Sequence, residues 1–150
     1  MNETTVWTTH VKAAPDAVFA ELSDLTNHAK WSPKPYRAEK TSEGPIGVGT
    51  TFKSWGWLPP KGKEYLNNVT ITAFDPGKKF SFEAVDPAGP VVPSIYTLTE
   101  ENGGTRVERS MRFAKPSGFN GVTWPLIFPM LVKPAIQKNL DAFRDVVEKG

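Results

Sequence analysis

The alternation of apolar and polar residues predicts a protein built largely of β-strands. Residues 6–11 place Trp7, Thr9 and Val11 on one face, which is the period of a strand. Between Tyr36 and Phe113 follow about six further β-rich runs, separated by turn sequences such as EGPIGVG, LPPKG, DPGKK, DPAGP and EENGG. Because most of these turns are short, we expect the strands to pair antiparallel.

Other segments have the periodicity of helices. An apolar stripe over Val18, Phe19 and Leu22 follows Pro15, a residue suited to the first turn of a helix. A second short helical turn is expected over DLTNHAKW, with Asp24 as its cap and His28 on its surface. One buried face of a final helix is predicted by residues spaced four, three and four apart: Ile136, Leu140, Phe143 and Val147.

The order of elements is therefore a strand, two short helices, about six strands and a long C-terminal helix. This order predicts the α+β class, with an antiparallel sheet whose concave face is covered by the long helix. The chain has 150 residues, with no internal repeat and no low-complexity segment. We therefore expect residues 1–150 to form a single domain.

Five sequence motifs, in this order, resemble those of one superfamily: AAPDAVFAELSDLTNHAKWSP, GPIGVGTTF, VTITAFDPGKKFSF, GGTRV and IQKNLDAFRDVVE. The chain is similar to the polyketide cyclase/dehydrase, START-like superfamily, also called SRPBCC or Bet v 1-like. The resemblance implies a helix-grip fold, a curved seven-stranded antiparallel sheet wrapped around the C-terminal helix. It also implies a cavity for a hydrophobic or aromatic small molecule, but no particular chemistry, since one fold serves many functions.

Composition and motifs exclude several classes of function. The formal charge is +2 with the two signs interspersed, so a nucleic-acid footprint is not expected. There is no cysteine and no HExxH pattern, and GVGTTF lacks the residues of a dinucleotide or phosphate loop. We therefore expect no metal and no cofactor. The N-terminus has no secretory signal, which makes the cytoplasm the expected location.

Aromatic residues on the strand faces are the stronger functional signal. Such faces often only pack a core, but some of these residues are expected to line a ligand cavity. Together with residues of the last strand and of the segment after it, the expected ligand-binding set is Trp55, Trp57, Phe82, Tyr96, Arg109, Met111, Trp124 and Phe128.

Arg109 stands out within this set. If Val107, Met111 and Phe113 face inward, a period of two turns Arg109 inward as well. A buried guanidinium needs a partner, either a carboxylate of the protein or one of a ligand. Protein partners considered are Glu64, Tyr65 and Glu83. Alternatively, a β-bulge turns Arg109 outward, or its long side chain reaches the rim.

The segment WPLIFPMLVKP, residues 124–134, is apolar and contains three prolines. It is too short for a membrane span, which needs about 20 apolar residues. Proline interrupts a helix interior but suits a first turn, so Pro134 is expected to start the final helix after a kinked approach. We interpret the segment as a gate for ligand, which allows a transient membrane contact. If Trp124 and Phe128 are exposed and far from a cavity, a docking surface is the better interpretation.

Three functions fit these observations. The first is binding, transport or sequestration of a hydrophobic or aromatic small molecule such as a lipid or polyketide. The second is an aromatase/cyclase-like enzyme, in which Arg109 with Tyr96 or Tyr36 would polarise a polyketide-type substrate. The third is a co-chaperone or protein-interaction module that uses Trp57, Leu58 or Leu126. Catalytic residues are not assigned, and a monomer or weak homodimer is expected.

Overall fold

The computed structural model describes residues 2–32, 36–58, 63–85, 91–114, 129–130 and 133–149. For residues 2–3, 56–58, 63–65 and 113–114 it describes the backbone only. The strands are β1 (Asn2–Val11), β2 (Tyr36–Lys40), β3 (Thr51–Leu58), β4 (Lys63–Asp75), β5 (Lys79–Val85), β6 (Val91–Glu101) and β7 (Gly104–Ala114). The helices are α1 (Pro15–Leu22), η1 (Leu25–Lys30) and α3 (Lys133–Lys149).

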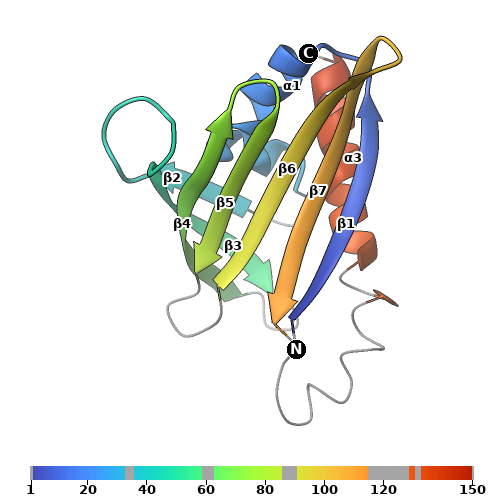
Figure 1. Cartoon of the computed structure of the whole chain (residues 1–150). Helices are drawn as coiled ribbons and strands as arrows, with labels where there is room; N and C mark the ends of the chain where they lie inside the picture. The colour runs from blue at the N-terminus through green and yellow to red at the C-terminus, as the bar shows by residue number, and fades with distance from the viewer. Residues whose placement is uncertain are drawn as a thin grey trace.

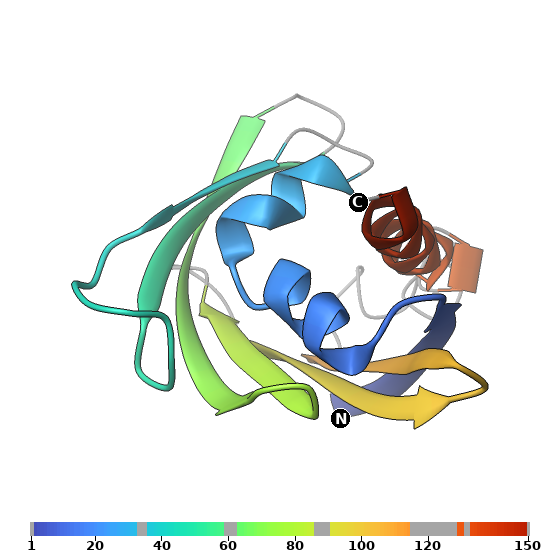
Figure 2. The same cartoon turned by 90° about the horizontal axis from the view of Figure 1, so that it is seen from above.

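The strands form one seven-stranded antiparallel sheet in the order β1-β7-β6-β5-β4-β3-β2. The first strand therefore pairs with the last, while the other strands follow one another as neighbours. The sheet curves around α1, η1 and α3, which lie on its concave side (Figures 1 and 2). This is the α+β helix-grip architecture that the sequence predicts.

Helix α1 closes one end of the concave face. It begins with Pro15 and carries Asp16 in its first turn, where an acidic side chain favours the helix dipole. Val18, Phe19 and Leu22 are buried, as predicted from their spacing. The Phe19 ring packs edge-on against Phe74 at 5.0 Å, so α1 is fixed to the strands beneath it.

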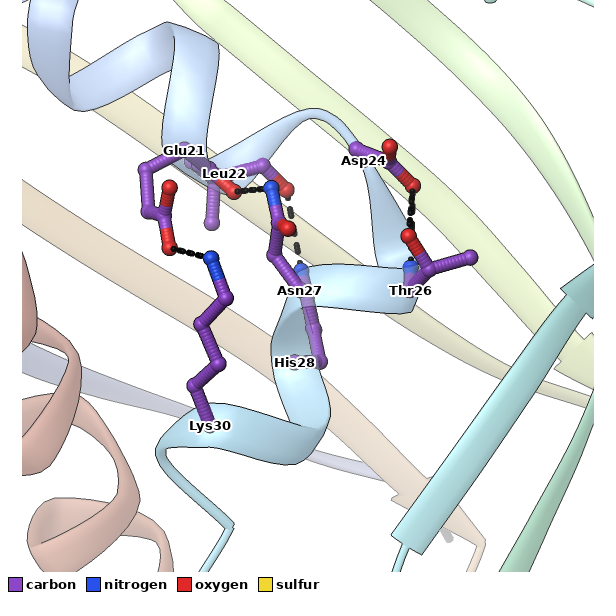
Figure 3. Close-up of polar contacts among 7 residues, drawn as sticks. All are labelled: Glu21, Leu22, Asp24, Thr26, Asn27, His28 and Lys30. Atoms are coloured by element: carbon purple, nitrogen blue, oxygen red, sulfur yellow. Dashed lines mark hydrogen bonds and ion pairs between the residues drawn. The ribbon is translucent and has the colours of Figure 1, made fainter.

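Helix η1 is a 3₁₀-helix, and this changes the position of His28. Asp24 caps η1 by accepting hydrogen bonds from the Thr26 backbone at 3.0 Å and the Thr26 hydroxyl at 2.7 Å (Figure 3). A 3₁₀-helix has three residues per turn, so Leu25, His28 and Trp31 follow one another along the same side. All three are buried. The expectation that His28 lies on the surface is therefore wrong.

Helix α3 begins at Lys133, so Pro134 falls in its first turn as predicted. Leu140 and Phe143 are buried, and Ile136 and Val147 pack against the same core. Two hydrogen bonds tie the start of α3 to β1: the Trp7 indole N–H donates to the Lys133 carbonyl at 3.0 Å, and the Gln137 amide to the Thr8 carbonyl at 3.3 Å. No helix in the described ranges has the length and apolarity that a membrane crossing requires.

Candidate functional site

A cavity of about 210 Å³ lies on the concave side, bounded by the sheet, η1 and α3. Its apolar lining comes from Val69, Phe82, Ala84 and Met111. Val69 and Ala84 face each other directly across the β4–β5 ladder, so together they form a continuous apolar surface. These inward positions follow from the alternation of side chains in β4, β5 and β7, which in β4 holds up to the register shift between Ile71 and Ala73.

Polar groups from six elements and the η1–β2 connection converge on the same space: His28, Ser32, Tyr36, Ser54, Asn67, Arg109 and Asn139. Ser54 lies directly opposite Asn67 in the β3–β4 ladder, and the Tyr36 hydroxyl is hydrogen-bonded to Ser54. A polar set inside a sheet normally needs partners, because an unpaired buried polar group is costly. The cavity therefore combines an apolar body with several groups able to orient a bound molecule.

Arg109 faces this cavity. Strand β7 pairs without a register shift on both sides, with Trp7 and Tyr96 directly opposite Arg109, so no bulge turns it outward. Its Nε donates to the Ser94 hydroxyl at 3.3 Å and its Nη1 to the Asn139 side-chain carbonyl at 3.0 Å. The guanidinium carbon also lies 5.1 Å from the centre of the Tyr96 ring, a cation–π contact.

All of these contacts of Arg109 are neutral. Among the described residues, no carboxylate forms an ion pair with it. Glu83, one of the predicted partners, is exposed and lies on the opposite face of β5 from Phe82, so that expectation is wrong. The side chains of Glu64 and Tyr65 lie outside the described residues.

His28 is held as a neutral imidazole. The pKa of His28 is lowered to about 4, mainly by burial and also by the nearby charge of Arg109, while the Leu22 carbonyl and Asp24 oppose this shift. The Nε2 atom lies 2.9 Å from the Leu22 carbonyl, which can only accept, so Nε2 carries the proton (Figure 3). The ring stands between Trp31 at 4.7 Å and Phe82 at 6.2 Å.

The two tyrosines near the cavity also stay uncharged at neutral pH. Burial raises the pKa of Tyr36 above its usual range, although its hydrogen bond to Ser54 opposes this. Burial likewise raises the pKa of Tyr96, although the charge of Arg109 opposes it. Arg109 is therefore the one formal charge among the described lining residues.

The structure brings part of the predicted ligand-binding set together. Phe82, Arg109 and Met111 line the cavity. Tyr96 lies behind them, 2 % exposed, with its ring 6.4 Å from that of Phe82. The side chain of Trp57 and the whole of Trp124 and Phe128 lie outside the described residues.

Trp55 requires a correction. It follows Ser54 in β3, and because Ser54 lines the cavity, alternation turns Trp55 to the other face of the sheet. There the Arg37 guanidinium carbon lies 3.8 Å from the centre of the indole ring, across the β2–β3 ladder. Trp55 is thus part of a surface cation–π pair and does not line the cavity.

Several lining residues were not predicted from the sequence. Asn139 sits three residues after Ile136 and four before Phe143, so the helical stripe that predicts α3 also places Asn139 beside its buried face. His28 could have been found from its spacing of three from both Leu25 and Trp31. No local signal distinguishes Ser54 and Asn67 from other polar strand residues. Among the described residues, no cluster of three His, Asp or Glu side chains offers a metal site.

The family described as "Polyketide cyclase / dehydrase and lipid transport" matches residues 3–148. The chain belongs to this family. The match spans nearly the whole sequence and confirms the resemblance that the motifs suggested. No curated protein matches the chain.

Solved structures share the polyketide cyclase family's helix-grip fold at low sequence identity. The ZhuI aromatase/cyclase from Streptomyces sp. R1128 has a TM-score of 0.79 at 14% identity, covering 99% of this chain and 95% of that one. The protein TTHA0849 from Thermus thermophilus has a TM-score of 0.75 at 17% identity, covering 97% of each chain. Ara h 8.0201 has a TM-score of 0.71 at 19% identity, covering 100% of both. These similarities establish the fold.

Proposed function

We propose that the protein binds a small molecule with an apolar or aromatic body in the cavity beneath the sheet, for transport or sequestration. The observation that carries the proposal is the composition of this cavity. Val69, Phe82, Ala84 and Met111 offer apolar contact, while a single guanidinium and several neutral polar groups converge on the same space. A largely apolar pocket with a few oriented polar groups is the usual form of a small-molecule site.

Ligand screening tests this function directly. Aromatic and aliphatic molecules should raise the melting temperature and alter tryptophan fluorescence, because a ligand that binds only the folded state stabilises it. Ala84→Leu should weaken binding at least about tenfold by filling space that the ligand needs. Ala20→Leu, on the exposed side of α1, is the matched control and should bind normally. A broad screen without any shift would contradict the proposal.

An aromatase/cyclase-like enzyme is the second candidate. It is favoured by one observation, that Tyr36 and Arg109 line the same cavity. A neutral phenol can donate a proton and a guanidinium can stabilise a developing oxyanion. If a substrate is converted, Tyr36→Phe should lower turnover while leaving substrate affinity within about threefold, since it removes only the hydroxyl. Equal turnover in Tyr36→Phe and the wild type would remove the tyrosine from such a mechanism.

The protein-interaction alternative receives less support. Large exposed apolar side chains in the described ranges are Val6, Val48, Val91 and Met130, and they belong to different segments of the chain. A docking surface normally requires a contiguous apolar patch. Capture of a defined protein partner by the purified protein would support this function.

A further inference from the structure

We infer that the ligand of this cavity is a compact monoanion, a single-ring aromatic carboxylate, whose carboxylate group pairs with Arg109. The inference rests on the proposed function, because it names the chemical class of molecule that the same cavity takes. It follows from the charge of the lining, the N–H groups of Arg109 that donate to no described residue, and the size of the space.

The first argument is charge balance. Arg109 is half-buried and keeps its positive charge at physiological pH, and a charge partly withdrawn from water is best stabilised when it is paired or fully hydrogen-bonded. Of the described groups around Arg109, Ser94 and Asn139 are neutral acceptors and Tyr96 offers only its ring face. The cavity thus contains one positive charge without a counter-ion among its described residues, and a carboxylate on the ligand would supply it.

The second argument is geometry. A guanidinium has five N–H donors, and the described residues accept two hydrogen bonds from Arg109. The remaining donors suit a carboxylate, which accepts two parallel hydrogen bonds from one guanidinium. Arg109 is also fixed on both sides, by β6 through Ser94 and by α3 through Asn139. It is therefore already oriented before a ligand arrives, which lowers the entropy cost of binding.

The third argument is that nothing described in the cavity repels an anion. His28, Tyr36 and Ser54 present neutral groups, and none of the described lining residues is acidic. The hydroxyls of Ser32 and Tyr36 and the amide of Asn67 can each donate a hydrogen bond to an oxygen atom. A cationic ligand would find no acidic group among the described lining residues and would be repelled by the charge of Arg109.

The fourth argument is size. An apolar cavity of about 150 Å³ is large enough to bind benzene. At about 210 Å³ this cavity accommodates one aromatic ring and a carboxylate. It is smaller than the roughly 300 Å³ at which sites for larger ligands begin, so a sterol or a long acyl chain does not fit the described space.

Calorimetric titration with benzoate and its neutral isostere benzamide tests the inference. Benzoate should bind the wild-type protein at least about 30-fold more tightly than benzamide, because only benzoate pairs with the guanidinium. Arg109→Gln should abolish this preference. Arg112→Gln is the matched control, since Arg112 is exposed on the opposite face of the same strand, and it should keep the preference.

The outcomes separate this inference from the proposed function. If neutral aromatic molecules bind but benzoate has no advantage over benzamide, the anion inference fails and ligand binding in the cavity stands. Retention of the benzoate preference by Arg109→Gln would also overturn it. If neither benzoate nor benzamide binds, and no neutral ligand in the screen shifts the melting temperature or the tryptophan fluorescence, the proposed function itself fails. If Arg109→Gln does not fold, the comparison of benzoate with benzamide on the wild-type protein still tests whether the cavity prefers an anion.

Discussion

The Nη1 atom of Arg109 lies 3.0 Å from the Oδ1 atom of Asn139, so the only charge of the described cavity lining is held by a neutral amide on α3. The same amide donates through Nδ2 to the Trp31 carbonyl at 3.4 Å. One asparagine therefore connects strand β7, helix α3 and the residue that ends η1. A ligand that pairs with Arg109 binds at the junction of these three elements, where it can stabilise their packing.

Replacing Asn139 by aspartate should convert the junction into an internal ion pair. The new carboxylate would occupy the guanidinium and repel an incoming anion, so Asn139→Asp should weaken benzoate binding at least about tenfold. Asn139→Ala removes the same hydrogen bonds without adding charge and should keep the preference for benzoate over benzamide. Equal benzoate affinity in Asn139→Asp and the wild type, measured by calorimetry, would contradict this prediction.

His28 should make the protein sensitive to mild acid. Its pKa is about 4 in the folded state, against 6.5 for an ordinary histidine, so the unfolded chain takes up a proton first as the pH falls. The contribution of neutral His28 to the free energy of unfolding is thus fully present above about pH 6.5. Roughly 3 kcal/mol of it is lost as the pH falls from about 6.5 to about 4. Urea unfolding at about pH 7 and about pH 4 measures this loss.

The two histidines of the chain provide the control for acid sensitivity. Between these two pH values, the free energy of unfolding of His28→Gln should fall by roughly 3 kcal/mol less than that of the wild type, because glutamine does not titrate. His10→Gln is the matched variant: His10 lies outside the cavity, bonded to the Glu101 carbonyl at 2.8 Å, so its replacement leaves the burial of His28 unchanged. Identical pH dependence in all three proteins would show that His28 already titrates normally.

Fluorescence should report ligand binding through one particular tryptophan. Trp31 is buried and its ring lies 4.7 Å from that of His28, which lines the cavity. Trp31→Phe should therefore remove most of the emission change caused by benzoate, and Trp55→Phe should retain it. Calorimetry on both variants checks that binding itself persists. If the emission change caused by benzoate disappears in Trp55→Phe, the ligand binds on the face of the sheet opposite the cavity.

The cap of η1 should contribute measurably to stability. Asp24→Ala removes the acceptor for the Thr26 backbone N–H and should lower the free energy of unfolding by about 1 kcal/mol. Asp24→Asn keeps a side-chain oxygen at the same position and should recover most of the loss. Chemical denaturation of the two variants and the wild type distinguishes a lost hydrogen bond from a lost charge.

Most of the fold is predictable from the sequence, because it depends on repeated local patterns. The spacing of Val18, Phe19 and Leu22 and the stripe from Ile136 to Val147 identify α1 and α3 with their buried faces. Alternation in β7 turns Arg109 inward once Val107 is buried. Location in the cytoplasm, a single domain, and a monomer or weak homodimer stay predictions.

The site is less predictable, because it depends on which strands and helices come together. Asn139 and Ser94 are partners of Arg109 although they lie 30 and 15 residues away in the chain. His28 is expected on the surface of a short helical turn, but the structure buries it, because η1 is a 3₁₀-helix that aligns His28 with Leu25 and Trp31. Trp55 was assigned to the cavity because aromatic character alone does not reveal which face of a strand is buried.

The pairing of β1 with β7 has a consequence for how the chain folds. Strand β1 is at the edge of the described sheet, where its neighbour β7 begins at Gly104, and its contact with α3 joins residues 126 positions apart in the chain. During synthesis on the ribosome, β1 emerges before the other six strands, but its partner β7 is the last of the seven to emerge. Such non-local closure slows folding, because the entropy cost of the long loop comes before any stabilising contact. The completed cavity can therefore form only in the last steps of folding.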